Sequence, residues 1–407
     1  MKASSTLRFA LIAQCGCNIG FFAVMPLLAH VLATSHALST SAIALVLSLR
    51  TFSQQGMFLL GGMLTDRFGA RSTLVCGFAL RIVGFMALGF SGTLPWLVLG
   101  ALCTGIGAAL FSPALQVLVS RAGANSARGT AGSFALFNMV GEIGTALGPL
   151  VALLLLPTGF AALATGCVLL FAVLAVVAWR VVPPHRAAPS GARPSRSRPR
   201  FSRRFLAFTI FSAINLVGYN QLYLGLPVEL RRIQAPGASI AWIFLGISLL
   251  SIACQLPLAR LGRHLGPGAT LRTGFGLMTL GFGTLALAAL SPGREPWSYL
   301  PVGCMVLCFI LGHLLVGPTI LHLCSQGPEA SRGARLGLQA SVSGVAVLLT
   351  GLVLGPLLER AAHSGPLAAL PWALLAVLGL LSAAVITRTI PPVAASATAE
   401  SQLSTTN

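Results

Sequence analysis

Four ionisable residues lie inside stretches of the chain that are otherwise apolar: Glu142, Arg50, Arg81 and His313. Charged side chains are costly in apolar surroundings and are kept there when they carry a proton or hold an ion. A carboxylate and an imidazole can both take up and release a proton, whereas a guanidinium keeps its charge. These residues together predict a proton-coupling site.

The composition indicates which elements must position that site. Of 407 residues, 56% are hydrophobic and 8% are charged, which is too apolar for an ordinary soluble domain. We therefore expect lipid to replace water around most of the chain.

Apolar runs of about 20 residues, the length that crosses a ~30 Å hydrocarbon core as a helix, occur in two sets. The first set covers 8–33, 42–65, 73–91, 95–120, 130–153 and 160–182, and the second covers 204–230, 240–261, 270–290, 299–322, 334–358 and 368–390. We predict an all-α membrane protein with twelve spans. The first run is too long for a signal peptide, so we expect it to be retained as a helix.

The net charge of +19 is unevenly placed. If both termini lie on one side, that side receives most of the loop arginines, among them Arg121 and Arg260, and the basic segment 183–204. This asymmetry predicts that both termini are cytoplasmic in a multi-pass protein of the bacterial inner membrane. Segment 183–204 is rich in Pro, Ser and Arg, so we expect a flexible linker, and the tail 391–407 is similar. An RNA-binding role for the linker lacks aromatic stacking partners.

The two halves of the chain repeat one another. Polar and aromatic residues at four-residue spacing in the first span recur 201 positions later in the seventh: Gln14, Asn18, Phe22 and Pro26, then Asn215, Tyr219, Tyr223 and Pro227. Gly148-Pro149-Leu150 likewise matches Gly355-Pro356-Leu357. The repeat predicts two pseudo-symmetric six-helix bundles, 1–182 and 205–390, an arrangement typical of alternating-access transporters.

A polar stretch between the second and third spans carries a recognisable pattern: Gly62, Leu64, Asp66, Arg67, Gly69 and Arg71. It resembles the loop signature of the major facilitator superfamily, with Ala70 where a cation is usual. The resemblance implies that Asp66 pairs with the neighbouring cations and with helix ends of the opposite half, which latches the cytoplasmic side. Alternatively, Asp66 only caps the third span. The second half has Arg263 at the corresponding position, so its copy is degenerate.

In the fifth span, Gly144, Gly148 and Pro149 resemble part of the Gly-Pro motif of drug:proton antiporters in that superfamily. This resemblance implies export. The match is partial, because Leu150 to Leu153 lack the usual glycine pair. The arginine usual in the fourth span is also missing, so proton coupling needs another arrangement.

Depth in the membrane suggests a partner for Glu142. It lies about 18 Å from the cytoplasmic face, and Arg50 about 13 Å from the other face, at a rise of ~1.5 Å per residue. These depths nearly coincide in a ~30 Å core, whereas Arg81 lies roughly 5 Å shallower. We therefore predict an Arg50–Glu142 pair, which could also be purely structural. His313 is a second candidate proton acceptor, or a residue that only hydrogen-bonds.

In the families that this chain resembles, spans one, four, seven and ten line a central cavity. Gln14, Asn18 and Phe22 would then face Asn215, Tyr219 and Tyr223, and Arg50, Gln54 and Gln55 would extend the wall. Such a mixture of rings and amides suits amphipathic organic molecules. The same stripes could instead form interhelical hydrogen bonds.

Several function classes are excluded or disfavoured. Lys2 is the only lysine, so the chain has no P-loop for ATP. No catalytic group is assembled, and the nine cysteines lack metal-site spacing, so we expect neither an enzyme nor a cofactor or metal. We predict a monomer whose partners are a small molecule, protons and lipid, but not nucleic acid. Three hypotheses remain: proton-coupled efflux of drugs or a metabolite such as a siderophore, proton-coupled uptake, and a non-transporting sensor.

Overall fold

The computed structural model describes residues 2–124, 129–184, 201–290, 299–325, 329–360 and 365–390. Most of the predicted linker and the tail 391–407 lie outside these residues. The described chain is helical throughout, in the order α1 (Lys2–Thr34), α2 (Thr40–Gly56), α3 (Phe58–Phe90), α4 (Leu94–Ala124), α5 (Gly129–Leu155), the 3-10 turn η1 (Leu156–Thr158), α6 (Phe160–Val181), α7 (Arg203–Ser212), α8 (Ile214–Gln221), α9 (Gly225–Arg232), α10 (Ser239–Ala289), α11 (Tyr299–Ser325), α12 (Glu329–Arg360) and α13 (Pro366–Thr389).

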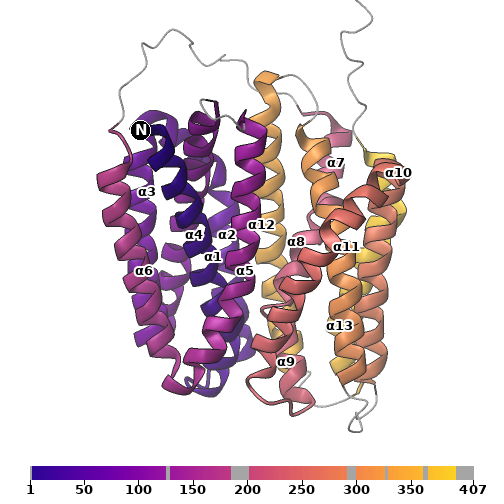
Figure 1. Ribbon diagram of the computed structural model, residues 1–407. Coiled ribbons are helices and arrows are strands. Elements are labelled where there is room, and N and C mark those ends of the chain that lie inside the picture. Colours follow the sequence, from indigo (N-terminus) through magenta and orange to yellow (C-terminus); the bar gives the residue numbers. More distant parts are fainter. Residues whose placement is uncertain are drawn as a thin grey trace, which may run out of the picture.

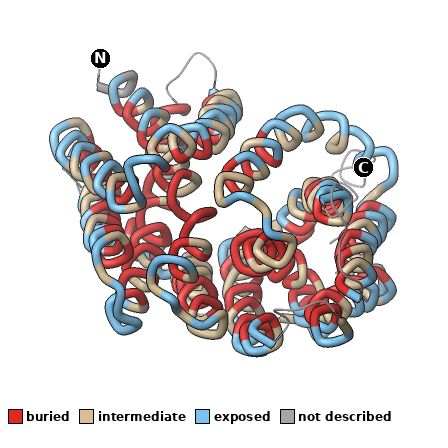
Figure 2. The backbone as a smooth tube through the Cα atoms, turned by 90° about the horizontal axis from the view of Figure 1, so that it is seen from below, coloured by how far each residue is buried: buried red, intermediate tan, exposed pale blue. Residues whose placement is uncertain are grey.

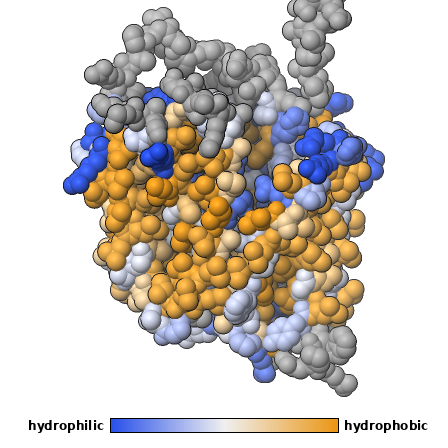
Figure 3. Space-filling model, viewed as in Figure 1, coloured by the Kyte–Doolittle hydropathy of each residue, from blue (hydrophilic) through white to orange (hydrophobic). Residues whose placement is uncertain are grey.

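The helices form two bundles that lie side by side (Figure 1). Helices α1 to α6 make up the first bundle and α7 to α13 the second, with buried residues facing the inside of each (Figure 2). Large hydrophobic side chains such as Leu154, Leu256 and Leu287 cover the outside, where they are 78%, 69% and 70% exposed. The space-filling view shows this apolar belt between two more hydrophilic ends (Figure 3). Such a surface is stable in lipid, and the protein is an integral, multi-pass membrane protein.

The helix count agrees with the predicted twelve crossings once broken helices are considered. Among the described residues, nine helices are long and apolar enough to span a membrane, and α7–α8 with α9 form a tenth span bent by 43°. Helix α10 has 51 residues, about 77 Å at 1.5 Å per residue, and so crosses twice. Helix α2 and the part of α3 before Gly69 together form the second crossing, and the part of α3 after Gly69 forms the third.

Two glycines make the turns within α3 and α10. Gly69 has φ 84° and ψ 156°, and Gly266 has φ 74° and ψ 164°. Residues with a side chain rarely adopt this backbone conformation. The two glycines hold equivalent positions in the two halves, so the duplication predicted from sequence extends to the backbone.

Some predicted boundaries were wrong. The polar stretches 66–72 and 262–269 were expected as loops, but both are helical apart from their glycine. Hydropathy indicates the part of a helix that lies in lipid. The backbone hydrogen bonds of the helix can continue beyond that part, so the helix is longer than its apolar stretch. The seventh span was expected as one helix, but it is broken at Ala213 and at 222–224. Pro227 follows the second break by one turn, and its ring crowds the carbonyl four residues earlier.

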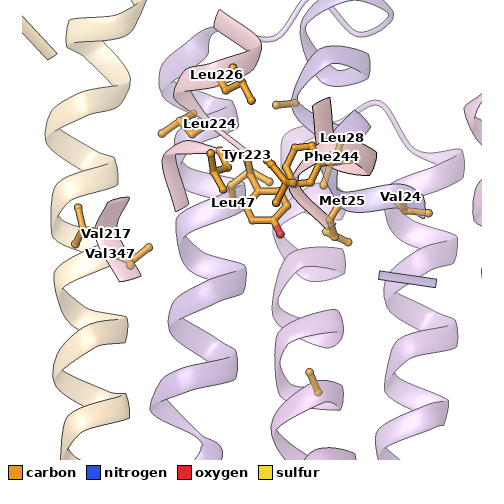
Figure 4. Packing of buried hydrophobic residues seen from close by; sticks show 14 of the residues in the cluster. Val24, Met25, Leu28, Leu47, Val217, Tyr223, Leu224, Leu226, Phe244 and Val347 are labelled. Carbon is orange, nitrogen blue, oxygen red and sulfur yellow. The ribbon is translucent and has the colours of Figure 1, made fainter. Parts of the chain in front are cut away.

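The bundles contact each other closely on the side away from residues 184 and 201. Here Tyr223 lies among Met25, Leu47 and Phe244, which belong to both halves (Figure 4). Tyr223 packs against Phe21, with ring centroids 5.9 Å apart, and Phe244, at 5.1 Å.

Two further polar contacts join the halves on that side. The Ser248 hydroxyl donates to the Thr145 carbonyl oxygen at 3.2 Å. At the end of the molecule, the Ser41 hydroxyl donates to the Glu359 carboxylate. The structure is therefore closed on the side opposite the linker.

Candidate functional site

A polar cavity of about 200 Å³ lies inside the first bundle. Four helices contribute its walls: Gln14, Cys17, Asn18, Phe21 and Phe22 from α1, Arg50 and Gln54 from α2, Arg81 from α3, and Ala108, Phe111 and Ser112 from α4. Six of these residues were predicted from sequence as cavity-lining or proton-coupling: Gln14, Asn18, Phe22, Arg50, Gln54 and Arg81. The depth argument had set Arg81 aside only as a partner for Glu142.

Arg50 is 7% exposed and stacks over the ring of Phe21, with its guanidinium carbon 4.5 Å from the ring centroid. One terminal nitrogen donates to Gln54 Oε1 at 2.6 Å. The Nε atom is buried without a hydrogen-bond partner among the described residues. The arginine is thus positioned by an aromatic face and a neutral amide rather than by an acid.

Arg81 is 3% exposed and is surrounded by aromatic rings. Its guanidinium carbon lies 5.6 Å, 5.2 Å and 5.3 Å from the centroids of Phe85, Phe111 and Phe171. Its Nε and Nη1 atoms have no hydrogen-bond partner among the described residues. Cation–π attraction holds this arginine in place but leaves the N–H groups of its Nε and Nη1 atoms without an acceptor among the described residues.

Glu142 is half-buried on α5, beside the contact between α5 and α1. The next residue toward the amino terminus, Gly141, accepts a hydrogen bond from Asn18 Nδ2 at 2.8 Å. The hydroxyl of Tyr219, across the bundle interface, is close enough to interact electrostatically with both Glu142 and Arg50. Glu142 therefore lies near the junction of the two halves.

The predicted Arg50–Glu142 ion pair is wrong for this structure. Among the described residues, the only ion pair within 4.0 Å joins Arg232 to Glu229, at 2.5 Å. Equal depth was an insufficient criterion, because α5 packs on α1 whereas α2 packs on α4 and α12.

The second bundle has a polar network where the repeat predicted cavity residues. His313 Nδ1 and Asn215 Oδ1 form a hydrogen bond of 2.9 Å. The His313 ring stacks on Tyr219, with centroids 4.8 Å apart. The Tyr223 hydroxyl donates to the Tyr219 hydroxyl at 3.4 Å. The structure thus brings His313 together with all three predicted residues of α8 and the segment after it.

The expected face-to-face arrangement of the two stripes is only partly present. Asn18 is turned toward α5, where it also donates to Thr145 Oγ1 at 3.2 Å. Phe21, rather than Phe22, reaches Tyr223. The alternative interpretation, interhelical hydrogen bonding, therefore applies to Asn18.

In the stretch expected to form a gate, Asp66 and Arg67 are exposed and lie in the last turn before Gly69. Asp66 was expected near the start of a helix, and it lies instead near the end of one. Arg71 does not pair with Asp66 within 4.0 Å; its guanidinium stacks on Trp179 of α6, 3.8 Å from the ring centroid. No latch to the opposite half is formed by the described residues in this conformation.

The glycines of the antiporter-like motif pack against α1. A Cβ atom on Gly144 would lie 2.5 Å from the Cys15 carbonyl oxygen, and one on Gly148 would lie 2.6 Å from Phe22 Cβ. Pro149 follows inside the helix and is buried. These small residues thus place α5, and with it Glu142, directly beside the cavity-lining face of α1.

Sequence reasoning missed four residues that connect these parts. Phe21 and Phe111 stack on the two arginines, and the Thr51 hydroxyl donates to Asn220 Oδ1 across the interface at 3.2 Å. Phe21, Thr51 and Asn220 each adjoin a predicted residue, so a wider helix face would have included them. Phe111 carries no such signal in the sequence.

Comparison with known sequences gives consistent matches along the chain. Residues 10–351 match the profile of the Major Facilitator Superfamily. An uncharacterized MFS-type transporter of Mycobacterium tuberculosis (strain ATCC 25618 / H37Rv) is 30% identical over 370 residues, covering 87% of this chain and 86% of its own. The Multidrug resistance protein MdtH of Aeromonas salmonicida (strain A449) is 28% identical over 371 residues, 89% of each chain. The MdtH of Escherichia coli O1:K1 / APEC is 27% identical over 387 residues, 92% of this chain and 91% of its own.

Solved structures agree on the fold. A POT family transporter in complex with 5-aminolevulinic acid superposes with a TM-score of 0.74 at 13% identity, covering 96% of this chain and 99% of that one. The nucleoside transporter NupG gives a TM-score of 0.75 at 13% identity, covering 95% and 100%. With the twelve crossings in two bundles and the family match over most of its length, this chain belongs to the Major Facilitator Superfamily and is a membrane transporter of a small-molecule substrate.

Proposed function

We propose that the protein is a proton-coupled antiporter that exports small organic compounds from the cytoplasm. The observation that carries this proposal is Glu142, a half-buried carboxylate near the junction of the halves, with no cation within 4.0 Å among the described residues. A carboxylate in that position can exchange a proton with whichever side of the membrane the central space faces.

Export is favoured by the relatives whose names refer to multidrug resistance, since they align with about nine tenths of this chain. The arginine distribution supports an inner-membrane protein whose linker side is cytoplasmic. In that orientation, closure opposite the linker corresponds to a state open toward the cytoplasm, from which substrate would load.

The proposed cycle uses the two bundles as rocking units. In the state open toward the cytoplasm, Glu142 releases its proton and substrate enters the central space. In the opposite state, substrate leaves and Glu142 is protonated again from outside. Tyr219, which interacts electrostatically with both Glu142 and Arg50, offers one route by which bound substrate could be sensed.

The test is a transport assay in proteoliposomes. The compound is chosen by comparing the medium of cells with and without the gene. Substrate-driven proton release is then followed with a trapped pH-sensitive dye. Glu142→Gln keeps the side-chain shape and removes the titration, so we expect loss of uphill transport and of proton release, with substrate exchange between liposome and medium retained.

Glu142→Asp is the matched control, because it keeps a titratable group on the same helix face and should retain part of the coupling. Undiminished proton release by the Gln variant would overturn the assignment of Glu142. Uptake remains the second candidate direction, and cells lacking the gene would then accumulate less of the compound rather than more. A sensor would tolerate the loss of both Glu142 and Arg50.

A further inference from the structure

The cavity of the first bundle contains two positive charges and no negative one. Both Arg50 and Arg81 line it, more than nine tenths buried, and they are close enough to repel each other electrostatically. None of the residues that line it is acidic. Glu142, on α5, is not among them.

Two buried, unpaired cations are expensive. Burying a charge without a partner is strongly unfavourable. Stacking on aromatic rings offsets only part of that cost. Buried N–H groups without an acceptor, as at Arg50 Nε and Arg81 Nε and Nη1, add to the cost. The unpartnered N–H groups of these two cations are suited to an anionic acceptor.

The remaining walls indicate the shape of that anion. Gln14, Asn18 and Gln54 provide amide groups, and Phe21, Phe22 and Phe111 provide aromatic faces. A guanidinium donates best to a planar carboxylate or to a phosphate. The volume of about 200 Å³ is below the ~300–1,000 Å³ of pockets that enclose a drug-sized ligand. The cavity is therefore large enough for the anionic group of a ligand and an aromatic ring next to it, but not for a whole drug-sized molecule.

We propose that this cavity binds the anionic group of the transported compound through Arg50 and Arg81, and that the substrates are amphipathic organic anions such as aromatic carboxylates. This inference rests on the proposed transport function and specifies the substrate class. The part of the substrate beyond its anionic end extends toward the interface, where Tyr219 and Tyr223 lie across from Phe21.

The test uses three naphthalene derivatives with the same ring and different charge: 2-naphthoate, 2-naphthamide and 2-naphthylmethylammonium. Binding to the purified full-length protein in detergent is measured by equilibrium dialysis and by the shift in unfolding temperature. We expect 2-naphthoate to bind at least tenfold more tightly than the amide, and the ammonium compound to bind most weakly.

The ratio of the affinities for 2-naphthoate and 2-naphthamide should fall at least tenfold in Arg81→Gln and in Arg50→Gln. Arg81→Lys should retain part of the preference for the carboxylate. Without ligand, the two Gln variants should unfold at a temperature equal to or above that of the wild type, because an unpaired buried charge has been removed. A merely structural arginine would instead lower the unfolding temperature when replaced.

Arg335→Gln is the matched control. Arg335 also stacks on a ring, with its guanidinium carbon 4.3 Å from the Phe205 centroid, and also has a buried Nε without a partner, but it lies outside the cavity. It should leave 2-naphthoate binding unchanged. Equal binding of the three compounds, or a carboxylate preference that survives in both Gln variants, would overturn the proposal.

The result can be separated from the antiport proposal. If Glu142→Gln abolishes coupled transport while the three compounds bind alike, the anion site is wrong and antiport stands. If carboxylate selectivity depends on Arg50 and Arg81 but no proton moves with substrate, the site stands and the coupling is wrong.

Discussion

At the residue scale, the ionisable side chains inside the spans have distinct surroundings. Arg50 and Arg81 lie on aromatic rings within one cavity, whereas Glu142 lies on another helix beside the bundle interface. In the proposed function, this separation leaves each group available to a different partner: a proton for Glu142 and an anion for the arginines. In a direct ion pair, the carboxylate and the guanidinium would have neutralised each other, and neither would be available to bind another partner.

His313 provides the residue-scale prediction. Its ring nitrogen hydrogen-bonds to Asn215 and its ring stacks on Tyr219. Since these contacts need a polar flat side chain rather than a titration, His313→Gln should keep proton:substrate coupling and lower the transport rate by less than about tenfold, ~1.4 kcal/mol.

Substrate-driven proton release in proteoliposomes measures the outcome, with Glu142→Gln in parallel as the uncoupled reference. Complete loss of coupling in His313→Gln, with unchanged substrate binding, would transfer the proton-carrying role from Glu142 to His313.

At the element scale, the approach of α5 to α1 decides where Glu142 lies. Gly144 lies so near the backbone of Cys15 that a Cβ atom would not fit between them. Helix α5 can therefore approach α1 this closely only because residue 144 has no side chain. Gly166 on α6 is a contrasting case, since it is exposed and a Cβ there would meet nothing within 4 Å.

Gly144→Ala should therefore destabilise the protein by about 1–3 kcal/mol, because backbone atoms must shift to admit the methyl group. Gly166→Ala should be neutral or stabilising by up to about 1 kcal/mol, because alanine loses less entropy in a helix. Unfolding temperatures in detergent compare the two. Equal stability of both variants would mean that the α1–α5 contact is looser than described.

At the scale of the whole molecule, the proposed alternating cycle gives the present arrangement of the two bundles a place as one of two end states. The bundles meet opposite the linker, through contacts such as that of Ser41 with Glu359, whereas Asp66 is exposed on the other side. The latch implied by the family resemblance would form only when the linker side closes.

Asp66→Asn should therefore leave expression and unfolding temperature unchanged but slow transport several-fold, by biasing the two conformations by on the order of 1–3 kcal/mol. Glu359→Gln weakens the opposite closure and should bias the equilibrium the other way.

Hydrogen–deuterium exchange shows which side of the molecule opens in each variant. It compares α3 near Gly69 with the ends of α2 and α12 near Ser41 and Glu359. Normal transport by Asp66→Asn at normal expression would remove the gating role.

The sequence by itself determined the class of protein and the two bundles. Span length, residue spacing and internal repeats are properties along one dimension, and lipid enforces them on every crossing helix. Gly69 belongs to the motif that the sequence singled out, whereas the equivalent turn at Gly266 was recognised only in the structure.

Only the tertiary structure decided which side chains meet. Depth fixes one coordinate of a residue, and the packing of neighbouring helices fixes the other two. Arg50 and Glu142 were predicted at one level but lie on helices that pack on different neighbours, while Arg81 and Phe111 come together from α3 and α4. The cavity with two cations arises from such lateral contacts, which no spacing along the chain encodes.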